Sequence, residues 1–497
     1  MNRMISLASK SGKVYEFEKE HFASGGMKDV HWGKGKSYVV AFYRDEQDYN
    51  SRDRIENIVN VYRERIFNLE GGDYWKDLLV WPYDVVEHDG KLGIVCPVYD
   101  GTFFFKHGSV NGDMLGIKGK EKEGKWFASA SNQNRFLDAK EKGDLRRYIQ
   151  ICIKLSRAVK RLHSAGLAHS DLSYKNVLVD PEGGNACIID NDSLVVPGKY
   201  PPDVVGTPDF IAPEVMATKG LPLTDPKRKL PSIATDKHAL AVLIYMYMFF
   251  RHPLRGGKNH DLDPTKDEEL LMGEKALFVE HPTDLSNRPN LSQVKKSYLP
   301  WADVNAIPFS ATGPYLKSLF VRSFIDGLHE PAKRPVANEW EIALVKTLDL
   351  IQPCANDKCS QKWFVFDNST SPSCPYCKTP YTKQLPVLDL YSSRSPGKYL
   401  PDNHRIMVYH NQYIYPWHID RSIFPNERLS EAEKKPVGYF VFHQNNWVLV
   451  NQNIPQLKNI NDGSEVAIGS SVRLEDGVKL QFGNKDTSRV ASVQIVN

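Results

Sequence analysis

The stretch HSDLSYKNVL, residues 169–178, places a carboxylate, Asp171, five positions before a carboxamide, Asn176. A helix is expected before it, because apolar residues recur at three- and four-residue intervals through residues 144–164. Two short apolar runs follow it and end in the sequence IIDND, which contains a second carboxylate, Asp190. We therefore expect a polar loop between a long helix and a pair of strands, with these three side chains converging on one point.

The three side chains suit phosphoryl transfer from ATP. That reaction needs one carboxylate to orient the attacking hydroxyl, and a carboxamide and a second carboxylate to hold the metal ions that bridge the phosphates. Asp171, Asn176 and Asp190 follow this order, with the spacing of the H-R-D-x-x-x-x-N loop. Lys175, four residues after Asp171, is a candidate for stabilising charge on the transferring group. The expected cofactors are ATP and Mg²⁺ or Mn²⁺.

Three later features support this interpretation of the loop. The sequence GTPDFIAPE at residues 206–214 is similar to the end of a kinase activation segment. Asp236 opens an apolar helix at the place where kinases keep an acid that braces the catalytic loop. Arg334, in the sequence PAKRP, is similar to the late arginine that pairs with the glutamate of A-P-E, here Glu214.

On these motifs the chain resembles the eukaryotic-type Ser/Thr protein kinases over about residues 12–350. The resemblance implies an α+β fold in two lobes, an N-lobe at about residues 12–100 and a C-lobe at about residues 101–350. It also implies that the hydroxyl acceptor belongs to a Ser or Thr of a protein substrate.

The expected N-lobe keeps only part of the nucleotide-binding motifs. The sequence HFASGGMKDV at residues 21–30 lies where kinases have a Gly-rich loop, and Gly25, Gly26 and Val30 keep the middle of that motif. Such a loop lets backbone N–H groups approach phosphates closely. A polar, Lys-rich segment at residues 106–142 is expected to be a solvated insertion after the hinge.

The phosphate-binding lysine of the third strand has no direct counterpart. Kinases have V-A-I-K in the strand that we expect at residues 37–44, and this chain has no lysine there. Arg44 is the nearest cation by spacing, with Lys28 or Lys36 on a neighbouring strand as alternatives. The following helix should carry the acidic partner of this cation, for which Glu64 fits the spacing.

Other departures leave two function classes open. Ser170 replaces the Arg that usually follows His, and Asn191-Asp192 replaces the Phe-Gly that usually follows the metal-binding Asp. Asp192 then adds a carboxylate near the metal, either as a further ligand or as an acceptor beside it. The first class is an active Mg²⁺-dependent Ser/Thr kinase. The second is a pseudokinase scaffold that binds partner proteins through the C-terminal part of the chain.

Four cysteines mark a separate module at residues 351–382. Cys354 and Cys359 form one pair, Cys374 and Cys377 form another, and 14 residues separate the pairs. Two thiolate pairs at this spacing can close a tetrahedron around Zn²⁺, and the arrangement resembles a zinc ribbon. Because protein ligands fill all four positions, the expected Zn²⁺ site is structural.

The pattern changes again at residues 383–497, where a two-residue period and Asn-Asp-Gly and Glu-Asp-Gly turns predict a β-sandwich. The sequence WVLVN at residues 447–451 with GSSVRLEDGV at residues 469–478 resembles the second half of forkhead-associated (FHA) domains. A kinase domain, a zinc ribbon and such a tail together resemble the bacterial kinases of the tellurite-resistance-associated, TerY-type phosphorylation systems. That resemblance implies a von Willebrand A-type protein and a metal-dependent protein phosphatase as partners in bacterial signalling.

Composition is that of an ordinary globular protein, with 41% hydrophobic and 25% charged residues. A formal net charge of +4 without a long basic run does not indicate a nucleic-acid surface. Residues 1–13 lack the apolar core of a signal peptide, and the longest apolar run, residues 239–250, is too short to span a bilayer. We therefore expect a cytoplasmic protein without a membrane or nucleic-acid partner.

Overall fold

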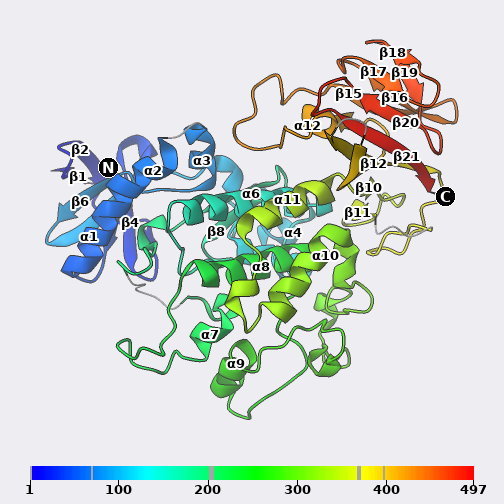
Figure 1. Cartoon of the computed structure of the whole chain (residues 1–497). Helices are drawn as coiled ribbons and strands as arrows, with labels where there is room; N and C mark the ends of the chain where they lie inside the picture. The colour runs from blue at the N-terminus through cyan, green and yellow to red at the C-terminus, as the bar shows by residue number, and fades with distance from the viewer. Residues whose placement is uncertain (1–2, 69–70, 201–205, 367–370, 396–397, 497) are drawn as a thin grey trace. The chain divides into compact units, whose positions relative to one another are not determined.

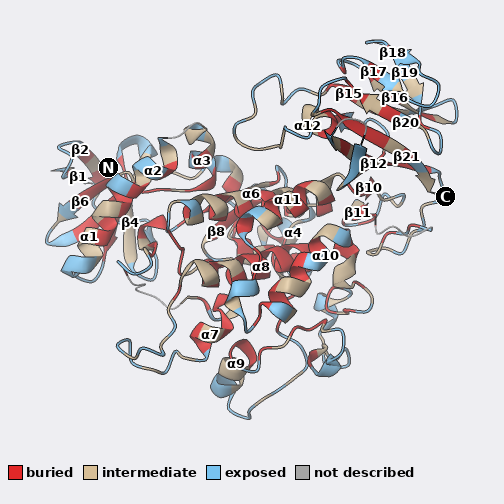
Figure 2. Cartoon of the chain, viewed as in Figure 1, coloured by how far each residue is buried: buried red, intermediate tan, exposed pale blue. Residues whose placement is uncertain are grey.

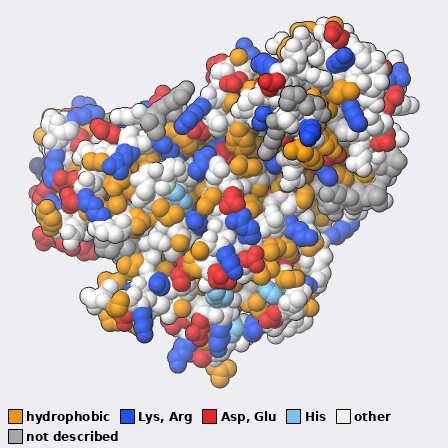
Figure 3. All heavy atoms as spheres, in the orientation of Figure 1, with side chains coloured by type: hydrophobic (Ala, Val, Ile, Leu, Met, Phe, Trp, Pro, Cys, Tyr) orange, Lys and Arg blue, Asp and Glu red, His pale blue; other side chains and the backbone are white. Residues whose placement is uncertain are grey.

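The computed structural model describes residues 3–68, 71–200, 206–366, 371–395 and 398–496. The chain divides into two compact units (Figure 1). The first comprises residues 1–143, 147–308 and 318–341, and the second comprises residues 144–146, 309–317 and 342–497. On the face drawn in Figure 3, acidic and basic side chains are interspersed.

The first unit begins with strands. Two hydrogen-bonded strands form a hairpin and are followed by a five-stranded antiparallel sheet with the order β3-β4-β5-β7-β6. The strands are β1 (Met4–Ala8), β2 (Val14–Glu18), β3 (Ala23–Ser24), β4 (Lys28–Trp32), β5 (Tyr38–Tyr43), β6 (Asp84–His88) and β7 (Lys91–Pro97).

Alternating side chains of β5 cover both faces of this sheet. Ala41 and Tyr43 pack into a core that includes Ile55 of the helical segment, while Val40 and Phe42 pack into a second core with Tyr15 and Phe17 of β2. Each face of the sheet is therefore closed, one by helices and the other by the β1–β2 hairpin. The helices between β5 and β6 are α1 (Tyr49–Asn57), α2 (Arg63–Phe67) and α3 (Gly72–Leu78), with a π-helical turn at Ile58–Tyr62.

Helices dominate the remainder of the first unit. The predicted amphipathic helix is α6 (Leu145–Ser164), and the predicted buried helix is α8 (Ile233–Phe249), which is buried over most of its length (Figure 2). The strand pair after the catalytic loop is β8 (Val177–Asp180) and β9 (Asn185–Ile188). The other helices are α4 (Val110–Asp113), α5 (Ala130–Arg135), α7 (Pro213–Met216), α9 (Pro264–Met272), α10 (Gly313–Val321) and α11 (Ala337–Leu348).

The segment at residues 106–142 is not the solvated loop that we expected. Lys122 is 1% exposed, and its ammonium lies 3.2 Å from Glu141 and 3.7 Å from Asp180. Phe127 and Leu137 are fully buried. The expectation was wrong because part of the Lys-rich segment neutralises its charge against acids inside the fold.

The second unit contains the cysteine module and two antiparallel sheets. Strands β10 (Ile351–Pro353) and β11 (Trp363–Val365) pair in the cysteine module. The sheets have the orders β13-β12-β21-β20-β17-β18 and β14-β15-β16-β19, and they share one apolar core, as a sandwich requires. Their strands are β12 (Leu385–Ser395), β13 (Lys398–Met407), β14 (Tyr413–Ile414), β15 (Gly438–His443), β16 (Asn446–Asn451), β17 (Leu457–Asn459), β18 (Glu465–Val466), β19 (Ser471–Arg473), β20 (Lys479–Phe482) and β21 (Arg489–Val496), with a short helix α12 (Pro416–Ile419).

Candidate active site

The loop after α6 is anchored through His169, which is fully buried. Its backbone N–H donates to Asp236 Oδ2 at 2.8 Å, and its Nε2 donates to the carbonyl oxygen of Ile189 at 2.9 Å. Asp236 also accepts a hydrogen bond from His163 at 3.1 Å. Asp236 at the start of α8 thus braces the loop, as predicted.

Asp171 is held on both carboxylate oxygens. The amide nitrogen of Asn176 donates to Asp171 Oδ2 at 3.0 Å and to its carbonyl oxygen at 2.8 Å. The backbone N–H of Thr207, in the activation segment, donates to Asp171 Oδ1 at 2.7 Å. Residues 201–205 of that segment lie outside the described residues. The carboxylate is therefore fixed in orientation by groups on two separate segments.

Asp190 lies beside this pair. The N–H of Ile189, the residue before Asp190, donates to the carbonyl oxygen of Asn176 at 3.0 Å, so a backbone bond holds the chain next to Asp190 against Asn176. Asp190 has a left-handed φ of +57°, and its side chain is 51% exposed. Lys175 is exposed on the same loop. The structure thus brings Asp171, Asn176 and Asp190 together, with Lys175 next to Asn176 in the chain.

The predicted Gly-rich loop is a tight hairpin between β3 and β4. Ala23 pairs with Val30, and the N–H of Gly25 donates to the carbonyl oxygen of Lys28 at 2.9 Å. Gly26 lies in the turn, where a Cβ would meet no atom within 4 Å. The turn is open enough for a ligand to approach its backbone.

The structure does not bring Arg44 and Glu64 together. Arg44 Nε lies 3.8 Å from Asp29 Oδ1, and its side chain is 40% exposed. Glu64 is exposed, and its carboxylate has no partner among the described residues. These two residues therefore do not form the cation–carboxylate pair that the spacing predicted.

Lys28, which the sequence offered only as an alternative, is the cation beside Asp190. Its ammonium lies 2.7 and 2.8 Å from the two oxygens of Asp192 and 3.4 Å from Asp190 Oδ1. The hydroxyl of Tyr43 donates to Asp192 Oδ2. Burial opposes the charge on Lys28, but the carboxylates of Asp192 and Asp190 outweigh it and raise the pKa of Lys28 well above its ordinary value.

A cleft of about 670 Å³ opens beneath the Gly-rich hairpin. Val30 and Val39 line it from the sheet, and Pro97 to Tyr99 line it from the connection that follows β7. Residues of the 106–142 segment form the opposite wall, including Ile117 and Trp126. The cleft is apolar with polar groups at its margins, as adenine-binding sites are.

A second cavity of about 710 Å³ is lined by residues that include Trp81, Val98 and Cys187. Asp171, Asn176 and Asp190 are not among its lining residues. These three residues do not line the cleft beneath the hairpin either, but Ala23 and Val30 of the predicted Gly-rich hairpin do.

The predicted pair of Glu214 and Arg334 is confirmed. The two terminal nitrogens of Arg334 donate to the two carboxylate oxygens of Glu214 at 2.8 and 2.7 Å. Arg334 is 1% exposed and also donates to the carbonyl oxygens of Gly327, Leu328 and Ala234. This bidentate pair fixes the end of the activation segment to the helical core.

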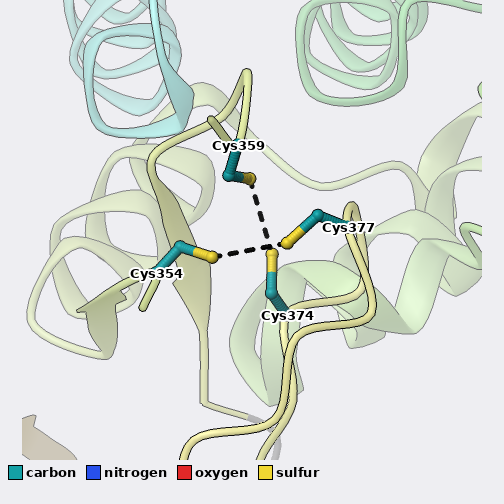
Figure 4. Close-up of side chains that lie close together, drawn as sticks. All are labelled: Cys354, Cys359, Cys374 and Cys377. Atoms are coloured by element: carbon teal, nitrogen blue, oxygen red, sulfur yellow. Dashed lines mark hydrogen bonds between the residues drawn. The ribbon is translucent and has the colours of Figure 1, made fainter. Parts of the chain in front are cut away.

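The four cysteines of the second unit converge (Figure 4). Their sulfur atoms all lie within 4.8 Å of one another, with 3.4 Å between Cys354 and Cys377 and 3.8 Å between Cys359 and Cys374. Four thiolates at Zn–S distances of about 2.3 Å from one ion would lie roughly 3.8 Å apart. The cluster therefore fits a tetrahedral Zn²⁺ ion.

Comparison with known proteins agrees with the geometry of the loop. The family model of the protein kinase domain matches residues 127–339. This stretch of the chain is therefore similar to a protein kinase domain. The matched residues include the catalytic loop, the A-P-E sequence and Arg334, whereas the β3–β4 hairpin and β5 precede the match.

Similar proteins carry Ser/Thr kinase names. Serine/threonine-protein kinase PknD of Chlamydia muridarum is 28% identical over 181 residues, which are 30% of this chain and 18% of that protein. Serine/threonine-protein kinase PkaB of Streptomyces coelicolor is 32% identical over 110 residues, 19% of this chain and 23% of that protein. Death-associated protein kinase dapk-1 of Caenorhabditis elegans is 33% identical over 102 residues, 20% of this chain and 6% of that protein.

The chain thus spans less than a quarter of the length of these relatives. Together with the family match, the similarities support a eukaryotic-like Ser/Thr protein kinase. Within the described ranges, none of the helices combines the length and the apolar character needed to cross a membrane.

Proposed function

We propose that this protein transfers the γ-phosphoryl group of ATP to a Ser or Thr hydroxyl of a protein substrate. The observation that carries the proposal is the double restraint on Asp171, by Asn176 at 3.0 Å and by the Thr207 N–H at 2.7 Å. A carboxylate held in this way is positioned to orient a hydroxyl and accept its proton.

The side chains present fit a divalent cation next to the phosphates. Asn176 uses its amide nitrogen for both bonds to Asp171, which leaves its amide oxygen as an acceptor. Asp190, with a half-exposed carboxylate, follows Ile189, whose N–H bonds to the carbonyl oxygen of Asn176, and amide and carboxylate oxygens are ligands that Mg²⁺ accepts. When bound, Mg²⁺ would neutralise charge on the phosphate oxygens.

In the proposed reaction, the hydroxyl oxygen of the substrate forms a bond to the γ-phosphorus, and the bond from that phosphorus to the oxygen of the β-phosphate breaks. Asp171 takes the hydroxyl proton. Lys175 is exposed beside Asn176 and is assigned to stabilising charge on the transferring group. The products are a phosphorylated side chain and ADP.

Replacing Asp171 or Asp190 by Asn tests these roles. Each substitution keeps the size of the side chain and removes a negative charge, so we expect transfer from labelled ATP to fall by at least about 100-fold. Asp389→Asn is a matched control, because Asp389 lies in the second unit and pairs with Arg405 at 2.6 Å. Full transfer by either active-site variant would contradict the assignment.

A pseudokinase scaffold is the alternative, and one observation favours it. The ammonium of Lys28 already has carboxylate partners in Asp192 and Asp190, and β5 lacks a lysine. Incubation of the purified chain with ATP and Mg²⁺ or Mn²⁺, followed by mass spectrometry, separates the two functions. Phosphorylated Ser or Thr residues that are missing in the Asp171→Asn protein support the kinase, and their absence from the wild type supports the scaffold.

We also propose that Cys354, Cys359, Cys374 and Cys377 hold a structural Zn²⁺ ion. The support is the convergence of four sulfur atoms within 4.8 Å, with Cys359 and Cys374 buried. Elemental analysis of natively purified protein should find about one zinc per chain, and Cys374→Ser should lose it and become protease-sensitive around residues 351–381. Cys152→Ser, at a buried cysteine of α6, should keep the zinc.

The C-terminal sheets are proposed as a protein-docking region of FHA-like type. Support comes from the sequence similarity at residues 447–478 and from the two sheets around one core. The partnership with a von Willebrand A-type protein and a metal-dependent phosphatase, and the cytoplasmic location, stay predictions from the sequence.

A further inference from the structure

We infer that Lys28 of β4 is the phosphate-binding cation of this kinase, and that Asp192 holds it in the role that a helix glutamate has in other kinases. The inference rests on the proposed phosphoryl transfer and names residues that act in the same site. It replaces the predicted pair of Arg44 and Glu64.

The position of Tyr43 explains why the cation comes from another strand. The sequence VAFY at residues 40–43 corresponds to V-A-I-K, so Tyr43 takes the place of the usual lysine. Lys28 is the cross-strand partner of Tyr43 in the β4–β5 register. Directly opposed residues of an antiparallel pair project to the same face of the sheet, and the Lys28 ammonium lies 5.5 Å from the centre of the Tyr43 ring. A lysine on β4 therefore reaches the space that the strand-three lysine would fill.

Asp192 is built to hold this ammonium. Its side chain is 4% exposed. Its two oxygens accept hydrogen bonds from the ammonium of Lys28 at 2.7 and 2.8 Å, and Oδ2 also accepts one from the hydroxyl of Tyr43. A carboxylate buried to this extent needs a cation and hydrogen bonds to stay ionised.

The ammonium of Lys28 also faces the open side of the site. It lies 3.4 Å from Asp190, whose side chain is 51% exposed, whereas the Lys28 side chain is 16% exposed. An ammonium has three donor hydrogens, and the two oxygens of Asp192 can occupy two of them. The third is directed at Asp190 Oδ1 at 3.4 Å, the longest of the three contacts, so it is the one that a phosphate oxygen beside Asp190 would replace.

The other candidate cations are placed differently. Arg44 contacts Asp29 at 3.8 Å, and the ammonium of Lys36 lies 5.3 Å from the centre of the Trp32 ring. Among the three cations that the sequence offered, Lys28 is the one that the structure pairs with Asp190 and Asp192.

This arrangement has a regulatory consequence. In kinases with a lysine on strand three, the lysine–glutamate pair forms only when the helix is positioned correctly, and helix movement controls activity. Here Lys28 lies on β4 and Asp192 lies on the loop after β9. The pair therefore contains no residue of α1 or α2. Activity should therefore be insensitive to Glu64→Gln, because Glu64 is exposed and contacts neither partner.

The experiment measures Mg²⁺·ATP affinity by calorimetry and phosphoryl transfer by labelled ATP for the full chain. Lys28→Met should weaken ATP binding at least about tenfold and slow transfer by about 100-fold. Lys34→Met is the matched control, because Lys34 lies in the turn between β4 and β5 with an exposed side chain paired to Glu16. It should change neither quantity by more than about twofold.

A double variant separates the effect of losing the ammonium from the effect of losing the fold. Lys28→Met alone leaves Asp192 buried without its cation, whereas Lys28→Met with Tyr43→Lys returns a lysine to the strand-three position beside Asp192. This double variant should recover at least about tenfold in transfer over Lys28→Met. Recovery would show that the ammonium near Asp192, and not the β4 strand itself, is required.

Two results would overturn the inference. One is that Lys28→Met keeps the Mg²⁺·ATP affinity and the transfer rate of the wild type. The other is that Arg44→Met, and not Lys28→Met, loses both the affinity and the rate. A wild-type chain that binds Mg²⁺·ATP without transferring phosphate would overturn the proposed transfer only, because the affinity change in Lys28→Met would still report the cation. A wild-type chain that does not bind Mg²⁺·ATP would overturn both.

Discussion

The β3–β7 sheet and the helical part of the first unit hold their candidate catalytic groups in different ways. In the helical part, Asp171 is fixed by an amide and a backbone N–H, and His169 and Asp236 connect the loop to α8. In the sheet, Lys28 reaches the same site through a long side chain whose ammonium is held by Asp192 and Asp190.

This difference accounts for where the family match begins. The match starts at residue 127 and includes the catalytic loop but not the sheet. A carboxylate such as Asp171, which is fixed by an amide and a backbone N–H, needs one loop conformation and one spacing between the residues of that loop. A cation that needs only to place its ammonium can come from either of two neighbouring strands, since opposed residues share one face. In this chain, the match to the family therefore includes the motifs of the helical part and not those of the sheet.

The largest expected effect is in the helical part, at Arg334. Arg334→Met leaves Glu214 without its buried partner, and the free energy of unfolding should fall by about 3–5 kcal/mol. Arg322→Met is the control, because Arg322 pairs with Glu339 at side chains that are 40% and 38% exposed, and it should cost less than about 1 kcal/mol. Urea titration followed by tryptophan fluorescence measures both. Equal losses would show that burial of the Glu214–Arg334 pair does not matter.

A smaller effect is expected in the sheet, at Asp84 of β6. This buried carboxylate accepts hydrogen bonds from Tyr15 at 2.9 Å, from Ser9 at 2.8 Å and from Ser11 at 2.7 Å, and so ties the β1–β2 hairpin to the sheet. Asp84→Ala leaves the buried Tyr15 hydroxyl without this acceptor and should cost about 2–3 kcal/mol. Hydrogen exchange should become faster in residues 4–18.

Ser11→Ala removes one of these bonds at an exposed residue and should cost about 1 kcal/mol or less. If Asp84→Ala left exchange in residues 4–18 unchanged, the hairpin would be held by its apolar contacts alone. If Asp84→Ala lowered the free energy of unfolding more than Arg334→Met does, the polar group that matters most for stability would lie in the sheet and not in the helical part.

The smallest expected effect is a pH dependence in the helical part. Burial lowers the pKa of His238 well below 6.5, and burial lowers the pKa of His252 to about 4. As the pH falls below 6.5, the unfolded chain binds protons at these positions and the folded chain does not. Stability should therefore fall with pH, by about 1.4 kcal/mol per pH unit for each histidine, until the folded-state pKa is reached.

His238→Leu tests this difference, because neither ring nitrogen of His238 has a hydrogen-bond partner among the described residues. The variant should lose less stability between pH 7 and pH 5 than the wild type, by roughly 1–2 kcal/mol. Urea titrations at the two pH values give the comparison. Identical losses in both proteins would mean that His238 takes up its proton in the folded state.

The sequence predicted the catalytic loop well because its geometry is local. Asp171 and Asn176 lie in one turn of chain, and Asn176 bonds directly to Asp171. The Glu214–Arg334 pair is far apart in sequence, but each partner lies in a recognisable motif. The zinc cluster is a similar case, in which the spacing within each cysteine pair indicates the site.

The cation and the insertion were harder to predict because both depend on strand register or distant partners. Spacing along β5 pointed to Arg44, whereas the pairing of Lys28 with Tyr43 follows from the β4–β5 register. Lys122 looks like a solvated lysine in the sequence, and its partner Asp180 is distant in the chain. Alternation within each strand does not reveal which residue of the next strand lies opposite.

The wall of the cleft formed by the 106–142 segment has a practical consequence for chemical inhibition. Ile117 and Trp126 line the cleft and precede residue 127, where the match to the protein kinase family begins. A compound that binds at Pro97 to Tyr99 and extends towards Trp126 would contact only residues that precede the matched region. Selectivity for this protein should therefore come from side chains outside the match, with Trp126 as the largest of them.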